Sequence, residues 1–499
     1  MQRPSRRIFA EALVMLIALV PALLWPGDTL WTNDEPRLLA NAWHANQAWH
    51  PAWGGLWGNF GIRYGPFPTQ FYQFLLSLTH DPLLLAMLRA GICASVSAGS
   101  LLWLARSAGL SPWFAGAALA APLVVHFHRL MWDASFAMPL GALALASLAA
   151  YLRRGRVWCL VLSIVSTAFF ATIHPQDLPL AAAIGGMLAW SHRPALRVHR
   201  KPLLIALAVF LALNGVFFVQ LAHLIFTRLG GAVSSGYPGG ESPGIALLAP
   251  FLGGNLLGGE SSWRTPGAVD AWMRLQAAII YPLCWAGIGI AALCASGRGR
   301  CPVGTALDPT AATRRDIMVV ALATVVMQGL LFAVMRVPSG AQYFFGTFAV
   351  HIFLAWLAVE SLPRPWLRFA CTAAYGVACG WLSLHALWLT HRDGSAIEPL
   401  QPTLGSQAEL ARTLNRAGAR SIFTDVAHLQ NYAQGVRALR LLLPPAEADS
   451  APRLLVRYRS GRRGEFDVSE MSAPSEQPEG FSEVDVTPLP EGWYPGLGK

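Results

Sequence analysis

Long apolar blocks, separated by short polar segments, recur from residue 8 to residue 390 of this 499-residue chain. A helix needs about 20 predominantly apolar residues to cross the hydrocarbon core of a bilayer, and most of the blocks approach that length. Only 13% of the residues are charged, whereas an ordinary soluble domain has about 25%. The sequence therefore predicts a polytopic α-helical membrane protein and excludes a soluble, fibrous or disulfide-stapled one.

Eleven apolar blocks are candidates for membrane-crossing helices, and the sixth of them is the weakest. They cover residues 8–25, 83–105, 112–128, 134–151, 157–173, 178–190, 202–226, 275–296, 317–335, 342–361 and 366–390. Two connections on the same side of the membrane are long, a first outer loop of residues 28–82 and a second of residues 227–274. We therefore expect about 11 transmembrane helices within a membrane module of residues 1–391.

The basic residues predict how these helices are oriented. The formal net charge is +10, and nearly all of the basic residues are arginine. Most of them flank the apolar blocks on the side of the N-terminus, as the positive-inside rule requires of cytoplasmic loops. We expect a cytoplasmic N-terminus with both long loops outside, and a lipid bilayer rather than nucleic acid as the partner of the basic charge.

The composition changes after the last apolar block, and residues 392–499 are expected to form a small soluble α/β domain outside the membrane. Its pattern predicts one amphipathic helix, Gln407 to Ala417, followed by short strands. The strands are expected at Ser421 to Thr424, Leu439 to Leu443, Leu454 to Tyr458 and Val484 to Val486.

Two adjacent carboxylates, Asp34 and Glu35, open the first outer loop directly beyond the first apolar block, and Arg37 follows them. Helix capping explains Glu35, because acidic residues near a helix N-terminus interact favourably with its dipole. It explains Asp34 less well. Ionisable groups close to hydrocarbon are costly and usually functional, so both acids are candidate catalytic residues.

A third acid, Asp133, lies where the third apolar block meets the outer surface and the fourth begins. Capping of that helix is the alternative explanation. Asp133 and Asp34 are expected on the same side of the membrane at neighbouring span ends. Two carboxylates that face one cavity raise each other's proton affinity, which suits one of them to act as a base.

Arginines and aromatic residues on the outer side are candidates for substrate binding. An arginine outside contradicts the positive-inside bias, and bidentate binding of a phosphate is a natural use of it, although surface ion pairs are the alternative. Aromatic side chains are available to stack on a sugar. The candidates are Arg37, Arg63, Tyr64, Arg129, Arg264, Arg336 and Trp57.

No metal site stands out in the sequence. The seven cysteines include no CxxC pair, which argues against a cysteine metal site. His126 and His128 are spaced i, i+2 and do not share a helix face, and His174 lies near the same surface. We assign no metal ligand, and the need for a divalent metal is left open.

The ordered set Asp34-Glu35-Pro36-Arg37, Tyr64-Gly65-Pro66 and Arg129 to Asp133 resembles the GT-C superfamily of polyprenyl-phosphate-sugar-dependent glycosyltransferases. Within it the chain looks most like the branch that contains the lipid A aminoarabinose transferase and the protein O-mannosyltransferases. The resemblance in layout covers residues 8–391. Family members commonly have Tyr after the arginine and a Lys before Pro-Pro in the loop, whereas this chain has Leu38 and Arg63.

The resemblance implies a role for each acid. Asp34 would be the catalytic carboxylate, Asp133 the second acidic position and Glu35 the neighbouring acid. The donor would be a polyprenyl-phosphate sugar, and the acceptor a hydroxyl of a lipid, glycan or protein at the outer face of a bacterial inner membrane, with the C-terminal domain in the periplasm. Transfer with inversion is expected.

A transporter or flippase for a lipid-linked sugar is the main alternative function. A membrane anchor for the C-terminal domain is a lesser alternative.

Overall fold

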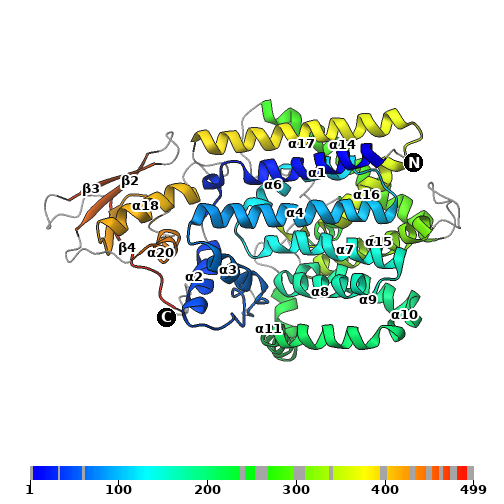
Figure 1. Cartoon of the computed structure of the whole chain (residues 1–499), viewed down its shortest axis with the longest axis horizontal. Coiled ribbons are helices and arrows are strands. Elements are labelled where there is room, and N and C mark those ends of the chain that lie inside the picture. Colours follow the sequence, from blue (N-terminus) through cyan, green and yellow to red (C-terminus); the bar gives the residue numbers. More distant parts are fainter. Residues whose placement is uncertain are drawn as a thin grey trace.

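The computed structural model describes residues 4–31, 34–58, 62–235, 242–252, 268–296, 309–335, 341–393, 402–426, 429, 433–444, 452–459, 465–471 and 480–491. Within this part of the chain, long helices lie side by side in one bundle, and a small sheet with two helices lies beyond one end of it (Figure 1). The chain is a polytopic α-helical membrane protein with a small C-terminal α/β region, as the sequence predicts.

The ends of the bundle helices follow from local sequence. In α4, the Asp81 carboxylate accepts the N–H groups of Leu83 and Leu84, and Gly109, with a φ of 67°, ends the helix in a left-handed conformation. The helices are α1 (Pro4–Leu23), α4 (Pro82–Ala108), α5 (Trp113–Leu119), α6 (Pro122–Arg129), α7 (Ala137–Arg154), α8 (Val157–Ile173), α9 (Leu178–Ser191), α10 (Arg193–Val198), α11 (Arg200–Ser235), α12 (Pro243–Leu248), α14 (Ala268–Ala295), α15 (Pro309–Met335), α16 (Phe348–Ser361) and α17 (Pro365–Asp393).

Six helical stretches in the described residues are long and apolar enough to cross a membrane, in α4, α7, α11, α14, α15 and α17. The helices α8 and α16 are shorter and apolar, and the total of 11 spans stays a prediction. One predicted span is wrong as a single helix. Residues 112–128 form α5 and α6, because Ala121 is extended and Pro122 has no N–H with which to continue the preceding helix.

The first outer loop is folded into α2 (Asp34–Gln47) and α3 (Phe67–Leu78), which pack against each other. Between them runs a short hairpin in which Gly55 donates its N–H to the Tyr64 carbonyl and Tyr64 donates to the Leu56 carbonyl, both over 2.8 Å. Apolar side chains of both helices join a core that continues into the C-terminal region. The loop is thereby fixed to the end of the bundle that faces the sheet (Figure 1).

The C-terminal sheet has the order β3-β2-β1-β4. It is built from β1 (Ser421–Thr424), β2 (Leu454–Arg459), β3 (Glu465–Glu470) and β4 (Ser482–Asp485), and it is accompanied by α18 (Leu404–Arg416) and α20 (Gln434–Arg440). The pairing of β1 with β2 is parallel, and the other two pairings are antiparallel.

Most of the expected elements of this region are present. The predicted helix matches α18, and three predicted strands match β1, β2 and β4. The predicted strand from Leu439 to Leu443 is wrong, since these residues form the end of α20 and the turn after it. A short apolar run does not distinguish strand from buried helix by itself. Strand β3 was not expected, and the domain boundary at residues 391 and 392 stays a prediction.

A buried tryptophan ties the bundle to the C-terminal region. Trp31, which is 0% exposed, donates its indole N–H to the Gly435 carbonyl over 2.9 Å, and its own carbonyl accepts the Gln407 amide over 2.7 Å. Nearby, Leu30 forms an isolated bridge with Thr403. These contacts place the start of α18 against the segment between α1 and α2.

Candidate active site

The Asp34 carboxylate occupies the first turn of α2 and is held from two sides. The indole N–H of Trp132 donates to its Oδ2 over 3.0 Å, and Nη1 of Arg37, one turn later, lies 3.5 Å from its Oδ1. The side chain of Asp34 keeps 38% of its exposure, so it is oriented and still accessible. An ionised carboxylate with this access can accept a proton from a bound hydroxyl.

Asp133 lies next to this carboxylate but in a different environment. It is 3% exposed, and its Oδ1 accepts the N–H of Ala134 over 2.8 Å. Burial raises the pKa of Asp133 to about 8, and the charge of Asp34 and that of Glu35 add to the shift. Glu35 is 5% exposed. The structure thus brings the three predicted acids together and makes Asp133 a proton-bearing group at neutral pH beside an accessible carboxylate.

The connector that carries Trp132 and Asp133 is fastened by side chains that the sequence analysis did not single out. The Arg89 guanidinium, which is fully buried on α4, donates to the carbonyls of Phe127 and His128 and to the Ser135 hydroxyl. It lies 4.9 Å from the centre of the Phe136 ring.

The hydroxyls of Tyr72 and Ser135 also hold the connector through bonds to its backbone. The Tyr72 hydroxyl donates to the Met131 carbonyl over 3.1 Å, and burial raises the pKa of Tyr72 so that it keeps its proton. Ser135 donates to the carbonyl of Trp132 over 2.7 Å. An arginine inside an apolar block was the available signal for Arg89, since such residues are rare and usually have a task.

Arg63, Tyr64 and Trp57 meet in the hairpin of the first outer loop. Arg63 forms a bridge with Trp57, and its guanidinium lies 5.4 Å from the centre of that indole ring. The Arg63 N–H donates to the Gln220 side chain on α11 over 2.6 Å, and the Gly65 N–H donates to the Thr172 carbonyl at the end of α8 over 2.9 Å. These bonds attach the hairpin to two bundle helices.

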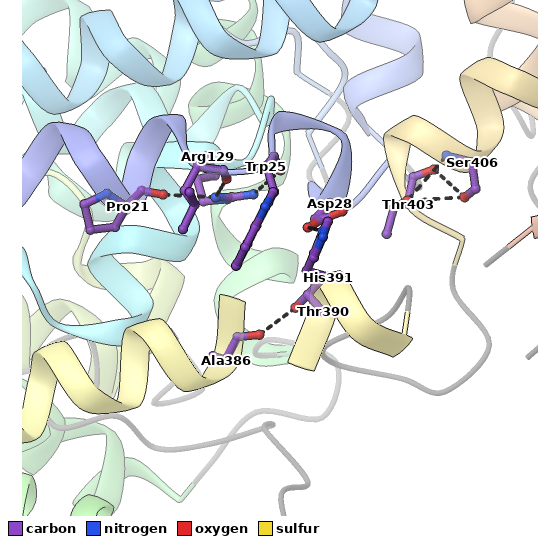
Figure 2. A network of polar contacts seen from close by, with 10 residues as sticks. Pro21, Trp25, Asp28, Arg129, Ala386, Thr390, His391, Thr403 and Ser406 are labelled. Atoms are coloured by element: carbon purple, nitrogen blue, oxygen red, sulfur yellow. Dashed lines mark hydrogen bonds and ion pairs between the residues drawn. The ribbon is translucent and has the colours of Figure 1, made fainter. Parts of the chain in front are cut away.

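Arg129 bonds the end of α1. Its guanidinium is 4% exposed and donates to the carbonyls of Pro21, Leu24 and Trp25 (Figure 2). The last carbonyls of a helix have no partner within their own helix. A cationic side chain at that end donates hydrogen bonds to them and interacts favourably with the helix dipole. The geometry gives Arg129 a structural task and adds no support for the expected contact with a phosphate.

A second contact network lies beside Arg129. Trp25, whose φ of 49° is left-handed, stacks on His391 with ring centres 4.2 Å apart. His391 Nδ1 lies 3.0 Å from Oδ2 of Asp28 (Figure 2). Thr403, at the start of α18, accepts the N–H of Ser406 with its hydroxyl. This network joins the ends of α1 and α17 rather than forming part of the acidic site.

The remaining candidates are two arginines and the histidines near the predicted outer surface. Arg264 and Arg336 lie outside the described residues. Within the described residues no group of three or more His, Cys, Asp and Glu side chains is arranged to hold a metal ion. His128 bonds Ser97 over 2.8 Å, and His174 bonds Asp177 over 2.8 Å.

No family model and no curated protein sequence matches the chain. Its fold does match solved structures. A crystal structure of ArnT from Cupriavidus metallidurans bound to undecaprenyl phosphate matches with a TM-score of 0.55 at 12% sequence identity, covering 95% of this chain and 99% of that one. The apo state of ArnT from the same organism gives a TM-score of 0.50 at 13% identity, covering 91% and 93%. The expectation of a GT-C-like fold is thereby confirmed over nearly the whole chain.

Proposed function

We propose that this protein is a membrane glycosyltransferase that moves one sugar from a polyprenyl-phosphate carrier to a hydroxyl acceptor, with inversion. The observation that carries the proposal is the Asp34 carboxylate, which is accessible, oriented by Trp132 and Arg37, and set beside buried Asp133. The fold supports it, because the ArnT structure that this chain resembles holds undecaprenyl phosphate. We place the protein in a bacterial inner membrane with this site on the periplasmic side.

The roles of the acids follow from their environments. Asp34 accepts the proton of the acceptor hydroxyl as its oxygen bonds to the anomeric carbon of the donor sugar. The bond from that carbon to the phosphate oxygen breaks, and its electron pair leaves with the phosphate. Because the leaving polyprenyl phosphate is stable as an anion, no general acid is needed to protonate it. Asp133 stays protonated at neutral pH, so it adds no repulsion to the phosphate.

Cations beside Asp34 would stabilise the leaving phosphate. Arg37 is the first candidate, because it lies one helical turn from the base and its side chain is 17% exposed. A fixed cation in a partly desolvated site interacts more strongly with a developing negative charge than one in water. Arg264 and Arg336 stay candidates from the sequence alone.

An apolar groove fits the carrier lipid. It has a volume of about 430 Å³ and lies among α8, α9 and α11, lined by Thr172 and by Phe210, Phe217 and other apolar side chains. Thr172 also accepts the N–H of Gly65, so the groove borders the hairpin that carries Arg63 and Tyr64. A polyprenyl chain in this groove would bring its phosphate toward the first outer loop.

The proposal is tested by transfer of a radiolabelled sugar from polyprenyl-phosphate donors to acceptors in membranes that contain the full chain. Asp34→Asn is expected to abolish transfer while inserting normally. Asp425→Asn, which changes an exposed carboxylate of the C-terminal region, is the matched control and is expected to retain full transfer. Equal transfer by wild type and Asp34→Asn would remove Asp34 from catalysis and favour the transporter.

A further inference from the structure

The polar face of α2 leads away from Asp34. Asp34, Arg37, Asn41 and His44 are spaced i, i+3, i+7 and i+10, so they lie along one side of the helix. All four are half-exposed, whereas Leu38, Leu39, Ala42 and Ala45 on the other sides are buried. Ten residues of helix advance about 15 Å, which is longer than one sugar ring. We call these four residues the α2 stripe.

A polar cavity of about 210 Å³ lies at the far end of the α2 stripe. Its polar and aromatic lining comes from Asn41, His44, His50, Trp53, Arg63 and Glu491. The set combines hydrogen-bonding side chains with an indole that is 56% exposed. An amphipathic ring beside several donors and acceptors suits a polyhydroxylated ring, which presents apolar C–H faces and hydroxyl edges.

The charge of the cavity argues against a phosphate as its occupant. Arg63 and Glu491 contribute charges of opposite sign, and the other lining side chains are polar or apolar without a fixed charge. An apolar lipid tail is equally unsuited, because the lining carries Asn, His, Arg and Glu side chains. A neutral sugar satisfies the donors and acceptors without leaving an unpaired charge.

The wall of the cavity is rigidly held. Gln73 on α3 accepts the Ala52 N–H over 2.8 Å and donates to the His50 carbonyl over 2.9 Å. Gln70 donates to the Ala52 carbonyl over 2.9 Å. These bonds fix the backbone of the segment that carries His50 and Trp53 against α3, so this wall of the cavity is formed before any ligand arrives.

The other wall comes from the C-terminal region. His44 bonds the Leu489 carbonyl over 2.8 Å, which brings the segment after β4 alongside α2 and puts Glu491 into the lining. The cavity therefore forms only where the first outer loop and the C-terminal region meet.

We propose that the acceptor is a glycan of at least two sugars, which lies along the α2 stripe with its reacting hydroxyl at Asp34 and a further sugar in the cavity against Trp53. The proposal rests on the proposed function for the reacting end only. The cavity, the stripe and the bound sugar are independent of whether Asp34 acts as the base.

The test is glycan binding by the full chain, purified in a detergent without a sugar head group. The probe is an array of immobilised bacterial glycans that runs from single sugars to hexasaccharides. We expect retention on one or more oligosaccharides and at least 10-fold weaker retention on their component single sugars. Retention on no glycan, or equal retention on single sugars, would overturn the proposal.

Variants locate the bound glycan. Trp53→Ala and Asn41→Ala, both at the cavity, are each expected to weaken retention at least fivefold. Trp49→Ala is the matched control, because Trp49 is 94% exposed and does not line the cavity. Thermal denaturation of each variant shows that the chain is folded. Unchanged retention by both Trp53→Ala and Asn41→Ala would place the glycan elsewhere and contradict the proposal.

Asp34→Asn separates this proposal from the proposed function. It is expected to weaken glycan retention less than Trp53→Ala does, because the cavity lies at the other end of the α2 stripe and Asp34 does not line it. Glycan retention that depends on Trp53, together with sugar transfer unaffected by Asp34→Asn, would support the binding site and reject the catalytic role. Transfer that requires Asp34 without any glycan retention would do the reverse.

Discussion

The indole N–H of Trp132 donates to a carboxylate oxygen of Asp34 over 3.0 Å, although the two residues are 98 positions apart in the sequence. The bond joins the connector between α6 and α7 to the first turn of α2. On its other side the Trp132 ring packs edge to face against Phe345, with ring centres 5.7 Å apart. The orientation of the carboxylate is thus set by the packing of the bundle and not by α2 alone.

Removal of this indole donor is expected to slow transfer. A hydrogen bond to a charged group contributes about 1.5–3 kcal/mol, so Trp132→Phe should lower kcat by roughly 10- to 100-fold. Because the indole contacts Asp34 and not the substrate in this proposal, KM should change by less than a factor of about three. Steady-state kinetics on the purified protein measure both constants. A variant that loses affinity and keeps its kcat would show that Trp132 contacts substrate instead.

The protonation of Asp133 predicts a pH dependence of stability. Its pKa is about 8 in the folded chain, against an ordinary value of 3.8. Between these two values the folded state holds a proton that the unfolded state has released, so stability falls as the pH rises through this window. Asp133→Asn is expected to remove this part of the slope. Thermal denaturation at a series of pH values compares the two proteins, and parallel slopes would show that Asp133 is ionised throughout.

The same group predicts an alkaline limit on activity. Above a pH of about 8 the ionised Asp133 would repel both Asp34 and the donor phosphate, so transfer by the wild type should decline. Asp133→Asn mimics the neutral form and should retain most of the rate at pH 7. Its pH–rate profile should lack the alkaline decline. A complete loss of transfer by Asp133→Asn at pH 7 would instead require a carboxylate at this position.

Replacement of Arg37 should lower activity, whereas replacement of Arg129 should lower stability. Arg37→Ala is expected to lower kcat by about 100-fold, by analogy with removal of one charge-stabilising donor, with little change in thermal stability. Arg129→Ala leaves the carbonyls at the end of α1 without their donor and should cost about 3 kcal/mol of folding free energy or more. Melting temperatures and transfer rates of both variants distinguish a catalytic from a structural role of each arginine. If Arg129→Ala had normal stability but no transfer, Arg129 would be a ligand of the phosphate.

Arg89 should behave as a positioning residue. Arg89→Met keeps much of the volume but leaves two backbone carbonyls and the Ser135 hydroxyl without their donor. We expect a lower melting temperature and a loss of kcat that exceeds any change in KM. Arg89→Lys supplies one ammonium in place of a forked guanidinium and should restore the activity only in part. Full activity in Arg89→Met would show that the connector keeps its shape unaided.

Features that depend on local sequence were predictable here, whereas long-range contacts were not. The positions of most helices and of strands such as β1 follow from block length and alternation. The acids could be expected close together because they flank neighbouring blocks. Arg129 was expected to face substrate because it contradicts the positive-inside bias, but the bias does not distinguish a free cation from one that satisfies helix carbonyls. The Trp132 donor and the Tyr72 hydroxyl have no signal in the sequence, because each depends on how distant segments pack.

The contact between Trp31 and Gln407 has a consequence for biosynthesis. These residues are 376 positions apart, so their bond closes only after the last long helix has left the ribosome. Until then the first outer loop has no C-terminal region to pack against. The Trp31 indole, which is buried in the folded chain, stays exposed. Contacts of such high sequence separation form late and slowly. The acidic site would therefore mature at the end of membrane insertion, and truncation upstream of α18 should leave inserted helices with an unfinished first loop.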